Sequence, residues 1–286
     1  MIRRTALLSA LTLSLLLAAC SKKNNDEAAV AEDAQGQAVS EEQAAAAGLA
    51  EAPAEAPPPK MDYWKALGPL LAGNYGGACM RTPDGRKMDA AITLGADGRA
   101  SSNGLEVDFR AAKSVILARS RDDKGQFSTM VLLSVDDNKA GMLTLNTGGP
   151  FKESTASLAR DDIGLMCSNV DGIERLNAKP VYQALPQLLD GKKQTIGCLD
   201  TKDLLVRRDT EVQVVDGVVR IGDTSFDLKE AVSEGFNFDD AGRSMSLVAV
   251  MPGERGINIA YDGAGKLTSV TVTKGLESTH SCSVQG

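Results

Sequence analysis

The sequence predicts an all-β fold built from two similar antiparallel β domains. Apolar residues alternate with polar ones or run in short stretches, and dipeptides such as Asp-Gly and Asn-Gly stand between those stretches. The second half of the chain also repeats landmarks of the first. In each domain a small closed barrel or a sandwich would hide the sheet edges, and the pattern fits either.

Residues 1–19 have the layout of a bacterial signal peptide. Two arginines precede an apolar stretch, residues 5–17, that is too short to span a bilayer as a stable helix. Small residues and a cysteine end the segment: Leu17-Ala18-Ala19-Cys20. This run resembles the lipobox of bacterial lipoproteins. The resemblance implies that Cys20 is acylated as the first residue of the mature chain, and that the lipid holds the protein to a membrane.

The same resemblance implies a place in the bacterial cell envelope. In lipoproteins of this class an aspartate directly after the cysteine tends to retain the protein in the inner membrane, and here Ser21 stands at that position. The outer membrane is therefore the expected location. A periplasmic and a surface-exposed orientation both stay open.

Residues 20–60 are predicted to form a disordered tether. They are rich in Ala, Glu, Gln and Pro, and the only aliphatic side chains larger than alanine are Val30, Val39 and Leu49. Such a composition cannot bury enough apolar surface to build a core. The segment should therefore hold the folded part of the chain at a distance from the lipid anchor.

From residue 61 onward the chain contains an internal repeat, which divides it into residues 61–170 and 171–286. The helical stretch at Trp64 aligns with the one at Tyr182, and a cysteine follows each. Further landmarks match in the same order: Asp97-Gly98 with Asp216-Gly217, Asp122-Asp123 with Asp239-Asp240, and Cys167-Ser168 with Cys282-Ser283. Two copies are too few and too long for a solenoid, so each copy is expected to form its own β domain.

Each copy is expected to begin with a short helical element and to continue as strands. Residues 63–71 and 182–189 have helical spacing, but Pro69 and Pro186 are predicted to break them into turns. Strand patterns follow at residues 90–94, 129–135, 246–250 and 267–272. The turn dipeptides between strands are Asp84-Gly85, Asp97-Gly98, Asn103-Gly104, Asp216-Gly217 and Asp262-Gly263.

Apart from Cys20, four of the five cysteines remain, and in an exported chain they should be oxidised. Cys79 and Cys198 stand early in the two copies, whereas Cys167 and Cys282 stand at their ends. A single domain that existed before the duplication had one early and one late cysteine, and these two could form a disulfide only with each other. The repeat therefore predicts the disulfides Cys79–Cys167 and Cys198–Cys282. Zinc ligation is the competing interpretation, but zinc sites usually have close ligand pairs, which this spacing lacks.

The sequence points to no catalytic residue, no metal site and no cofactor. It lacks the common nucleophile, zinc and phosphate-loop motifs, and its acidic pairs do not have the spacing of a calcium loop. The single histidine, His280, has Leu165 as its counterpart in the first copy, so a site built on it would belong to one copy only. With 31 basic and 38 acidic residues and no basic stripe, the chain is not expected to bind nucleic acid.

Three residues are weak candidates for a ligand site: Trp64, Tyr182 and His280. Trp64 and Tyr182 are equivalent positions, and packing against the strands of their own domain is the favoured interpretation of both. The expected function is that of a non-enzymatic envelope lipoprotein. Its tandem β domains would bind a partner, either an envelope protein or peptidoglycan, or would serve as a scaffold.

Two alternatives to this function stay open. A domain of this size with a cysteine near each end is similar to the small barrel inhibitors of host lysozymes that some bacterial lipoproteins carry. That likeness implies lysozyme or another protein as the ligand. The other alternative is a hydrolase of unrecognised type that uses His280.

Overall fold

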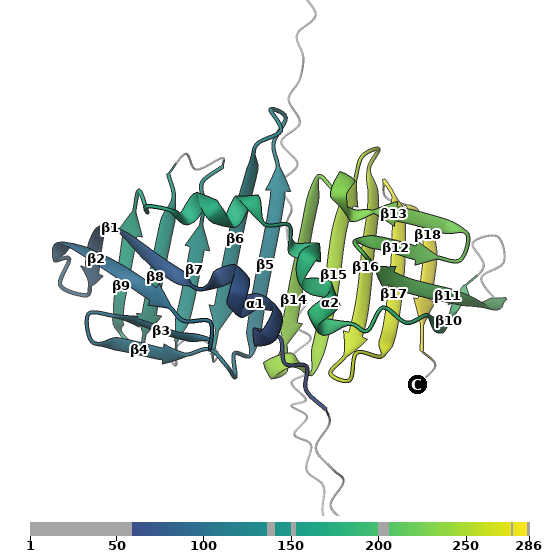
Figure 1. The fold of residues 1–286 in the computed structure, drawn as a ribbon, viewed down its shortest axis with the longest axis horizontal. Coiled ribbons are helices and arrows are strands. Elements are labelled where there is room, and N and C mark those ends of the chain that lie inside the picture. Colours follow the sequence, from purple (N-terminus) through teal and green to yellow (C-terminus); the bar gives the residue numbers. More distant parts are fainter. Residues whose placement is uncertain (1–58, 136–140, 150–152, 200–205, 276, 285–286) are drawn as a thin grey trace, which may run out of the picture. The chain divides into compact units, whose positions relative to one another are not determined.

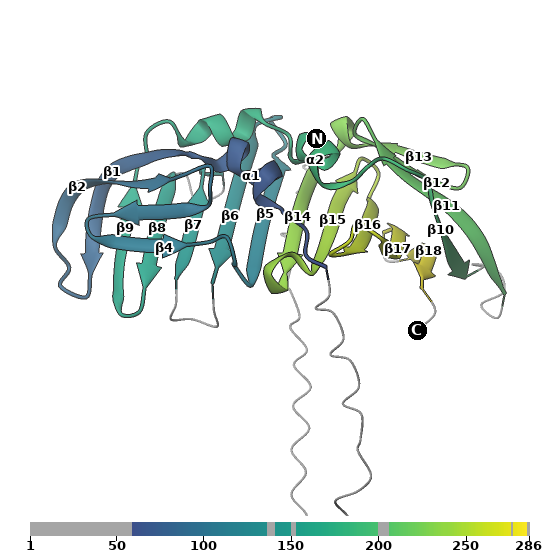
Figure 2. The same cartoon turned by 60° about the horizontal axis from the view of Figure 1, so that its bottom comes forward.

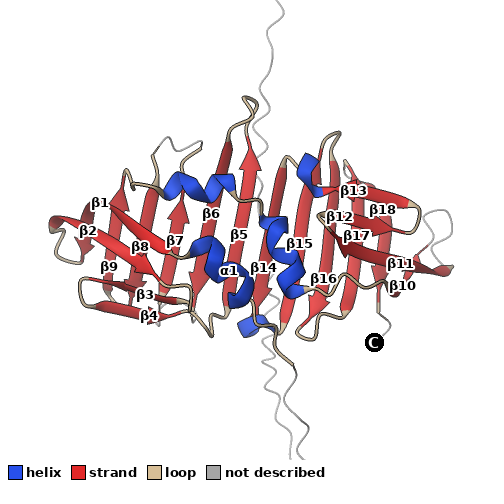
Figure 3. Cartoon of the chain, viewed as in Figure 1, coloured by secondary structure: helices blue, strands red, loops and turns tan. Residues whose placement is uncertain are grey.

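The computed structural model describes residues 59–135, 141–149, 153–199, 206–275 and 277–284 (Figure 1). All of these residues belong to one compact unit. Strands make up most of it (Figure 3). The expected signal peptide, Cys20 and the expected tether up to residue 58 lie outside the described residues. Of the described helices, none is long and apolar enough to cross a membrane.

The first half begins with one helix and continues as strands. Its elements are α1 (Trp64–Leu71), β1 (Gly73–Thr82), β2 (Lys87–Leu94), β3 (Arg99–Ser102), β4 (Leu105–Asp108), β5 (Ser114–Arg121), β6 (Phe127–Ser134), β7 (Met142–Asn146), β8 (Thr155–Arg160) and β9 (Ile163–Ser168). Two 3-10 helices, η1 (Ile173–Ala178) and η2 (Val181–Ala184), then lead into the second half.

The second half follows the same order of elements. It consists of α2 (Leu185–Leu188), β10 (Gln194–Leu199), β11 (Arg207–Val215), β12 (Val218–Ile221), β13 (Thr224–Asp227), β14 (Ser233–Asp239), β15 (Ser244–Met251), β16 (Arg255–Asp262), β17 (Leu267–Lys274) and β18 (Glu277–Ser283). Two further 3-10 helices, η3 (Leu228–Glu230) and η4 (Asp240–Gly242), flank β14. The expected all-β fold class is confirmed.

All described strands form one antiparallel sheet. Followed from neighbour to neighbour, the pairings of the first half run β4–β3–β2–β1–β9–β8–β7–β6–β5. Those of the second half run β14–β15–β16–β17–β18–β10–β11–β12–β13. The strand orders of the two halves therefore correspond, β5 to β14 and β4 to β13.

The two halves meet where β5 pairs with β14, in a ladder that runs from Ser114 opposite Asp239 to Ser120 opposite Ser233. Leu117 lies opposite Phe236 at its middle, and Ala118 lies opposite Gly235 beside that pair. The division into domains 61–170 and 171–286 stays a prediction. What the structure adds is that both segments contribute to one continuous sheet.

In the first half the sheet folds over itself. β2, β3 and β4 contact β8. Figure 2 shows these three strands as a second layer over β8 and the strands next to β8. In the second half β10 contacts β17. Successive side chains of a strand point to opposite faces of the sheet, and those on one face fill the core between the layers. In β7, for example, Leu143 and Leu145 are buried while Met142 is exposed. The packing within the first half is thus that of a two-layered sheet.

The helices cover the strands where the halves meet. Figure 3 shows α1 and α2 in front of the central strands, and the two helices contact each other. The prediction that Pro69 breaks the first helix is wrong, because α1 runs through Pro69 to Leu71. Pro69 stands in the last turn, where it removes few helical bonds, and the buried Leu67 and Leu71 fix the helix to the core. Pro186 stands at the start of the short α2.

Two disulfides tie the first strand of each half to its last. Cys79 of β1 lies directly opposite Cys167 of β9 and is bonded to it. Cys198 of β10 lies opposite Cys282 of β18 and is bonded to it. The predicted pairing is confirmed.

Candidate functional site

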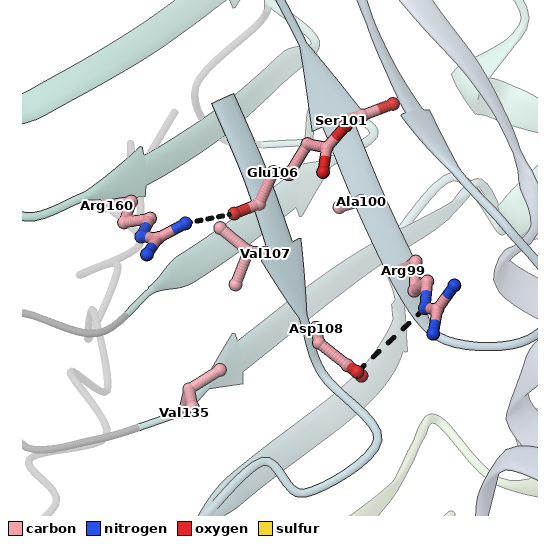
Figure 4. A pocket seen from close by; sticks show the side chains of 8 residues that line it. All are labelled: Arg99, Ala100, Ser101, Glu106, Val107, Asp108, Val135 and Arg160. Atoms are coloured by element: carbon pink, nitrogen blue, oxygen red, sulfur yellow. Dashed lines mark hydrogen bonds and ion pairs between the residues drawn. The ribbon is translucent and has the colours of Figure 1, made fainter. Parts of the chain in front are cut away.

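A pocket of about 590 Å³ lies beside β4 (Figure 4). Strands β3 and β4, the residue after β6 and the end of β8 supply its walls. The lining residues are Arg99, Ala100, Ser101, Glu106, Val107, Asp108, Val135 and Arg160. Charged and hydroxyl side chains surround it, while Ala100 and Val107 are buried beneath.

The backbone of β4 contributes to this pocket. The β3–β4 hairpin turns through Asn103 and Gly104, both at positive φ, so Ser102 and Leu105 form its closing hydrogen-bonded pair. Because hydrogen-bonded and non-bonded pairs alternate along an antiparallel ladder, the amide groups of Glu106 point away from β3. In agreement, the Glu106 carbonyl accepts a 3.0 Å hydrogen bond from Nη1 of Arg160. In the described residues, β4 pairs along one side only, with β3.

Hydrogen bonds and ion pairs with arginine side chains fix the carboxylate of Asp108 in the pocket. Asp108 accepts hydrogen bonds from the side chain of Arg110, and Nε of Arg99 lies 3.9 Å from its Oδ2. The Arg110 hydrogen bond lowers the pKa of Asp108 to about 2. Asp108 is therefore ionised at neutral pH. An ionised carboxylate that arginine already neutralises is a poor proton donor or acceptor, so this pocket suits binding better than acid–base chemistry.

The arrangement fits an extended polar chain. Guanidinium and carboxylate groups of opposite sign stand around the pocket, and the open side of β4 offers the N–H of Glu106. A strand with one open side can be extended by the backbone of a peptide, which gains main-chain hydrogen bonds there. In the described residues, no three His, Cys, Asp or Glu side chains gather as metal ligands would.

Trp64 and Tyr182, two of the weak candidates, occupy corresponding structural positions. The indole Nε1 of Trp64 donates a 2.8 Å hydrogen bond to the carbonyl of Phe109, and its ring lies against Gly98. The ring of Tyr182 lies against Gly217 in the same way. Each aromatic ring thus packs against a later turn of its own half.

His280, the third candidate, lies on β18 opposite Val272. It is partly buried, and its Nδ1 lies 3.3 Å from Oγ1 of Thr279. Cys282 lies opposite Val270 on the same strand pair, so both side chains share one face, as alternation requires. The three candidates come from α1, η2 and β18, and the structure does not bring them together into one site.

A buried ion pair joins the two halves. Nη1 of Arg119 lies 3.3 Å from Oε1 of Glu234, and the two side chains are 9% and 4% exposed. Glu234 also accepts a 3.0 Å hydrogen bond from the Val181 N–H, and Arg119 donates through Nε and Nη2 to the Asn177 carbonyl. Burial raises the pKa of Glu234. The pair thus fastens the connecting segment to the point where β5 meets β14.

No sequence motif marked Arg99, Arg160 or the Arg119–Glu234 pair in advance. Arg99 and Arg160 stand beside turn aspartates, where charged residues are ordinary. One signal was present for β4, since Asn103-Gly104 placed a tight hairpin there. It did not indicate that β4 would have an open side.

The fold and the pocket together describe a disulfide-bonded, all-β protein with a polar pocket beside the end of the sheet. Compared with known proteins, the chain matches no family model, no curated protein and no solved structure.

Proposed function

We propose that this chain is a non-enzymatic envelope lipoprotein whose β-sheet unit binds an extended peptide segment of another envelope protein along β4. The observation that carries the proposal is the pocket of about 590 Å³ beside the open side of this strand. The Glu106 N–H supplies a backbone donor, and Arg99 and Arg160 supply side-chain donors for the carbonyl or carboxylate groups of the peptide.

The anchor belongs to the same proposal. The lipobox at residues 17–20 supports acylation of Cys20, and Ser21 supports sorting to the outer membrane. An anchored binding module meets its partners at the membrane surface. The Ala- and Pro-rich residues 21–60 supply enough chain for such a module to reach a partner some distance away.

The test uses the backbone of one residue. Glu106→Pro removes the N–H that points away from β3 while leaving the bonds between β4 and β3 intact, because those use the neighbouring residues. Glu106→Ala is the matched control, since it removes the carboxylate but keeps the N–H. A photo-cross-linking residue at Ser101, which lines the pocket, reports occupancy in intact cells. The same residue at Thr195, which is exposed on β10 and lies opposite Glu211 of β11, is the control position.

Adducts with an envelope protein are expected from Ser101 and not from Thr195. They should disappear with Glu106→Pro and persist with Glu106→Ala. Equal labelling at both positions, or adducts that survive Glu106→Pro, would refute strand addition at β4. Inhibition of lysozyme by the purified chain would favour the inhibitor alternative instead. Hydrolysis of peptidoglycan or ester substrates that is lost in His280→Ala would favour the hydrolase alternative.

A further inference from the structure

The outward face of the eight central strands is almost free of charge. These strands run β8–β7–β6–β5–β14–β15–β16–β17, and their outward residues alternate with the buried core residues. We call this set the outer face. Its residues are Thr155, Ser157, Ala159, Met142, Thr144, Asn146, Ser128, Met130, Leu132, Ser134, Ser114, Ile116, Ala118, Ser120, Ser233, Gly235, Asn237, Asp239, Ser244, Ser246, Val248, Val250, Gly256, Asn258, Ala260, Asp262, Ser269, Thr271 and Thr273.

Charge is distributed very unevenly over this protein. On the outer face only Asp239 and Asp262 are charged, and each is the last residue of its strand. The strands outside this face carry exposed charges in contrast: Lys87, Asp89, Arg99, Glu106, Asp108, Arg207, Asp209, Glu211 and Arg220. Exposed sheet surfaces normally carry charges that oppose association. Their near absence from one face indicates that this face is covered.

The middle of the outer face is apolar. Met130, Ala118, Gly235 and Val248 are successive cross-strand neighbours on β6, β5, β14 and β15. Met130 and Val248 are each 43% exposed, and Val250 beside them is 41% exposed. This row crosses the junction of the two halves, with Met130 and Val248 in corresponding positions on either side of it. Exposed apolar side chains grouped in this way on a sheet are typical of an interface core.

The composition of the outer face excludes several kinds of partner. It has no Lys or Arg to attract nucleic acid or anionic lipid headgroups, and no aromatic ring on which a sugar could stack. A charged protein surface would lose hydration against it without gaining ion pairs. The partner that matches an uncharged, partly apolar sheet surface is another surface of the same kind.

The size of the outer face suits a stable dimer. Eight strands at about 4.8 Å spacing and roughly seven residues of about 3.3 Å each give an area of about 900 Å². A standard specific interface buries about 800 Å² on each partner. We propose that the outer face is a docking surface for a second copy of this chain, so that two sheets pack face to face around Ala118 and Gly235. This proposal is independent of the pocket beside β4.

The test is the mass of the protein in solution. The full chain is used with Cys20→Ser, so that no acyl chain causes association, and its mass is measured by sedimentation equilibrium at micromolar concentration. The expected result is twice the chain mass. Val248→Lys places a charge in the middle of the interface and should return the protein to the monomer mass. Thr195→Lys adds the same charge at an exposed position on β10 and should leave the dimer intact.

Met130→Lys is the second interface variant, for use if Val248→Lys lowers the melting temperature of the protein sharply. A parent chain with the monomer mass overturns the proposal, and so does a dimer that survives both lysine variants. If a monomeric parent chain instead binds phosphatidylcholine vesicles or purified peptidoglycan, and Val248→Lys abolishes that binding, the outer face serves that other partner and the proposal is wrong.

Discussion

Arg119 and Glu234 are the charged residues that lie buried where the two halves meet. Two positions along the same ladder, Leu117 faces Phe236, an apolar pair. If β5 paired with a second β5 about Ala118, Arg119 would face Leu117 and lie buried without a partner charge. Such a pairing is costly, because an unpaired buried charge keeps its full desolvation penalty. The ion pair therefore favours the pairing of β5 with β14 over the pairing of like strands.

The first prediction concerns Arg119→Met. At neutral pH this substitution should reduce the free energy of unfolding by about 3 to 5 kcal/mol, because it leaves the Glu234 carboxylate buried and uncompensated. The loss should depend on pH. Burial raises the pKa of Glu234 in the folded protein above its unfolded value of 4.5. The stability that comes from protonated Glu234 is therefore fully present below pH 4.5, and it is lost as the pH rises through the folded pKa.

Urea unfolding at about pH 4 and about pH 7 measures this dependence. The difference between parent and variant should be small at the lower pH and large at the higher one. Arg220→Met, at an exposed position on β12, is the control and should be nearly neutral at both. A loss in Arg119→Met that is the same at both pH values would show that Glu234 is not responsible for it.

The second prediction separates a backbone effect from a side-chain contact at two glycines. Gly98 and Gly85 both have positive φ, but a Cβ on Gly98 would lie 2.6 Å from Cε2 of Trp64, whereas nothing lies within 4 Å of one on Gly85. Gly85→Ala should therefore destabilise the protein by about 1 kcal/mol, through the strained backbone alone. Gly98→Ala should cost about 3 kcal/mol, since the indole must also move. Thermal unfolding measures both, and equal losses would contradict the role given to Trp64.

At the scale of elements, the local features of the fold were predictable from the sequence. Alternation placed strands over residues that lie in β2, β6, β15 and β17, because period-two patterning is a local property of the chain. Turn dipeptides located hairpins such as the one at Asn103-Gly104. The disulfides followed from the repeat. Pro69 misled the helix prediction, because a proline in the last turn is tolerated when packing fixes the helix.

The long-range features were not predictable in the same way. The pairing of β5 with β14 joins strands far apart in the sequence, and either strand would fit other partners of equal alternation. The pocket beside β4 depends on long-range packing too, because the folded sheet brings Val135, directly after β6, and Arg160, at the end of β8, beside the β3–β4 hairpin. A residue such as Arg160, which belongs to no sequence motif, lines the pocket only because the fold places it beside residues from distant parts of the chain.

The third prediction concerns the disulfide between β1 and β9. Replacing Cys79 and Cys167 together by serine opens a loop whose ends are 88 residues apart in sequence. In the chain-entropy model the free energy of unfolding should fall by about 4 to 5 kcal/mol. Hydrogen exchange should show the loss first in β8 and β9, which neighbour the bond. The matched variant without Cys198 and Cys282 should instead affect β17 and β18 first, and identical exchange maps for the two variants would rule out this local action.

At the scale of the whole molecule, charge divides the surface into two parts. Exposed charges gather on strands such as β2, β4 and β11, whereas the outer face carries two at its strand ends. The proposed peptide site lies in the charged part, and the proposed dimer interface lies in the uncharged part. The pocket takes Arg160 from the end of β8, but Arg160 does not belong to the outer face. The two proposed surfaces therefore share no residue, so a dimer would present two pockets at once.

The fourth prediction concerns attachment of the whole molecule to the membrane. Cys20→Ser should abolish the incorporation of labelled fatty acid and move the protein from the membrane fraction to the soluble fraction, because the thiol is the proposed acylation site. Cys79→Ser, which leaves Cys20 in place, is the control and should remain labelled. Continued labelling of the Cys20→Ser protein in outer-membrane fractions would show that the lipobox resemblance is misleading.

The ladder between β5 and β14 also sets an order of events during synthesis. A ribosome completes β5 and its neighbours up to β9 before β14 exists, so for that interval β5 has hydrogen-bond partners on one side only. Its open amide groups have no strand partner, and Arg119 has no partner carboxylate, until β14 arrives. A chain that ends prematurely near Ser168 would keep this edge exposed permanently, and an exposed strand edge promotes aggregation with other chains. The cell must therefore either finish this polypeptide promptly or degrade its fragments.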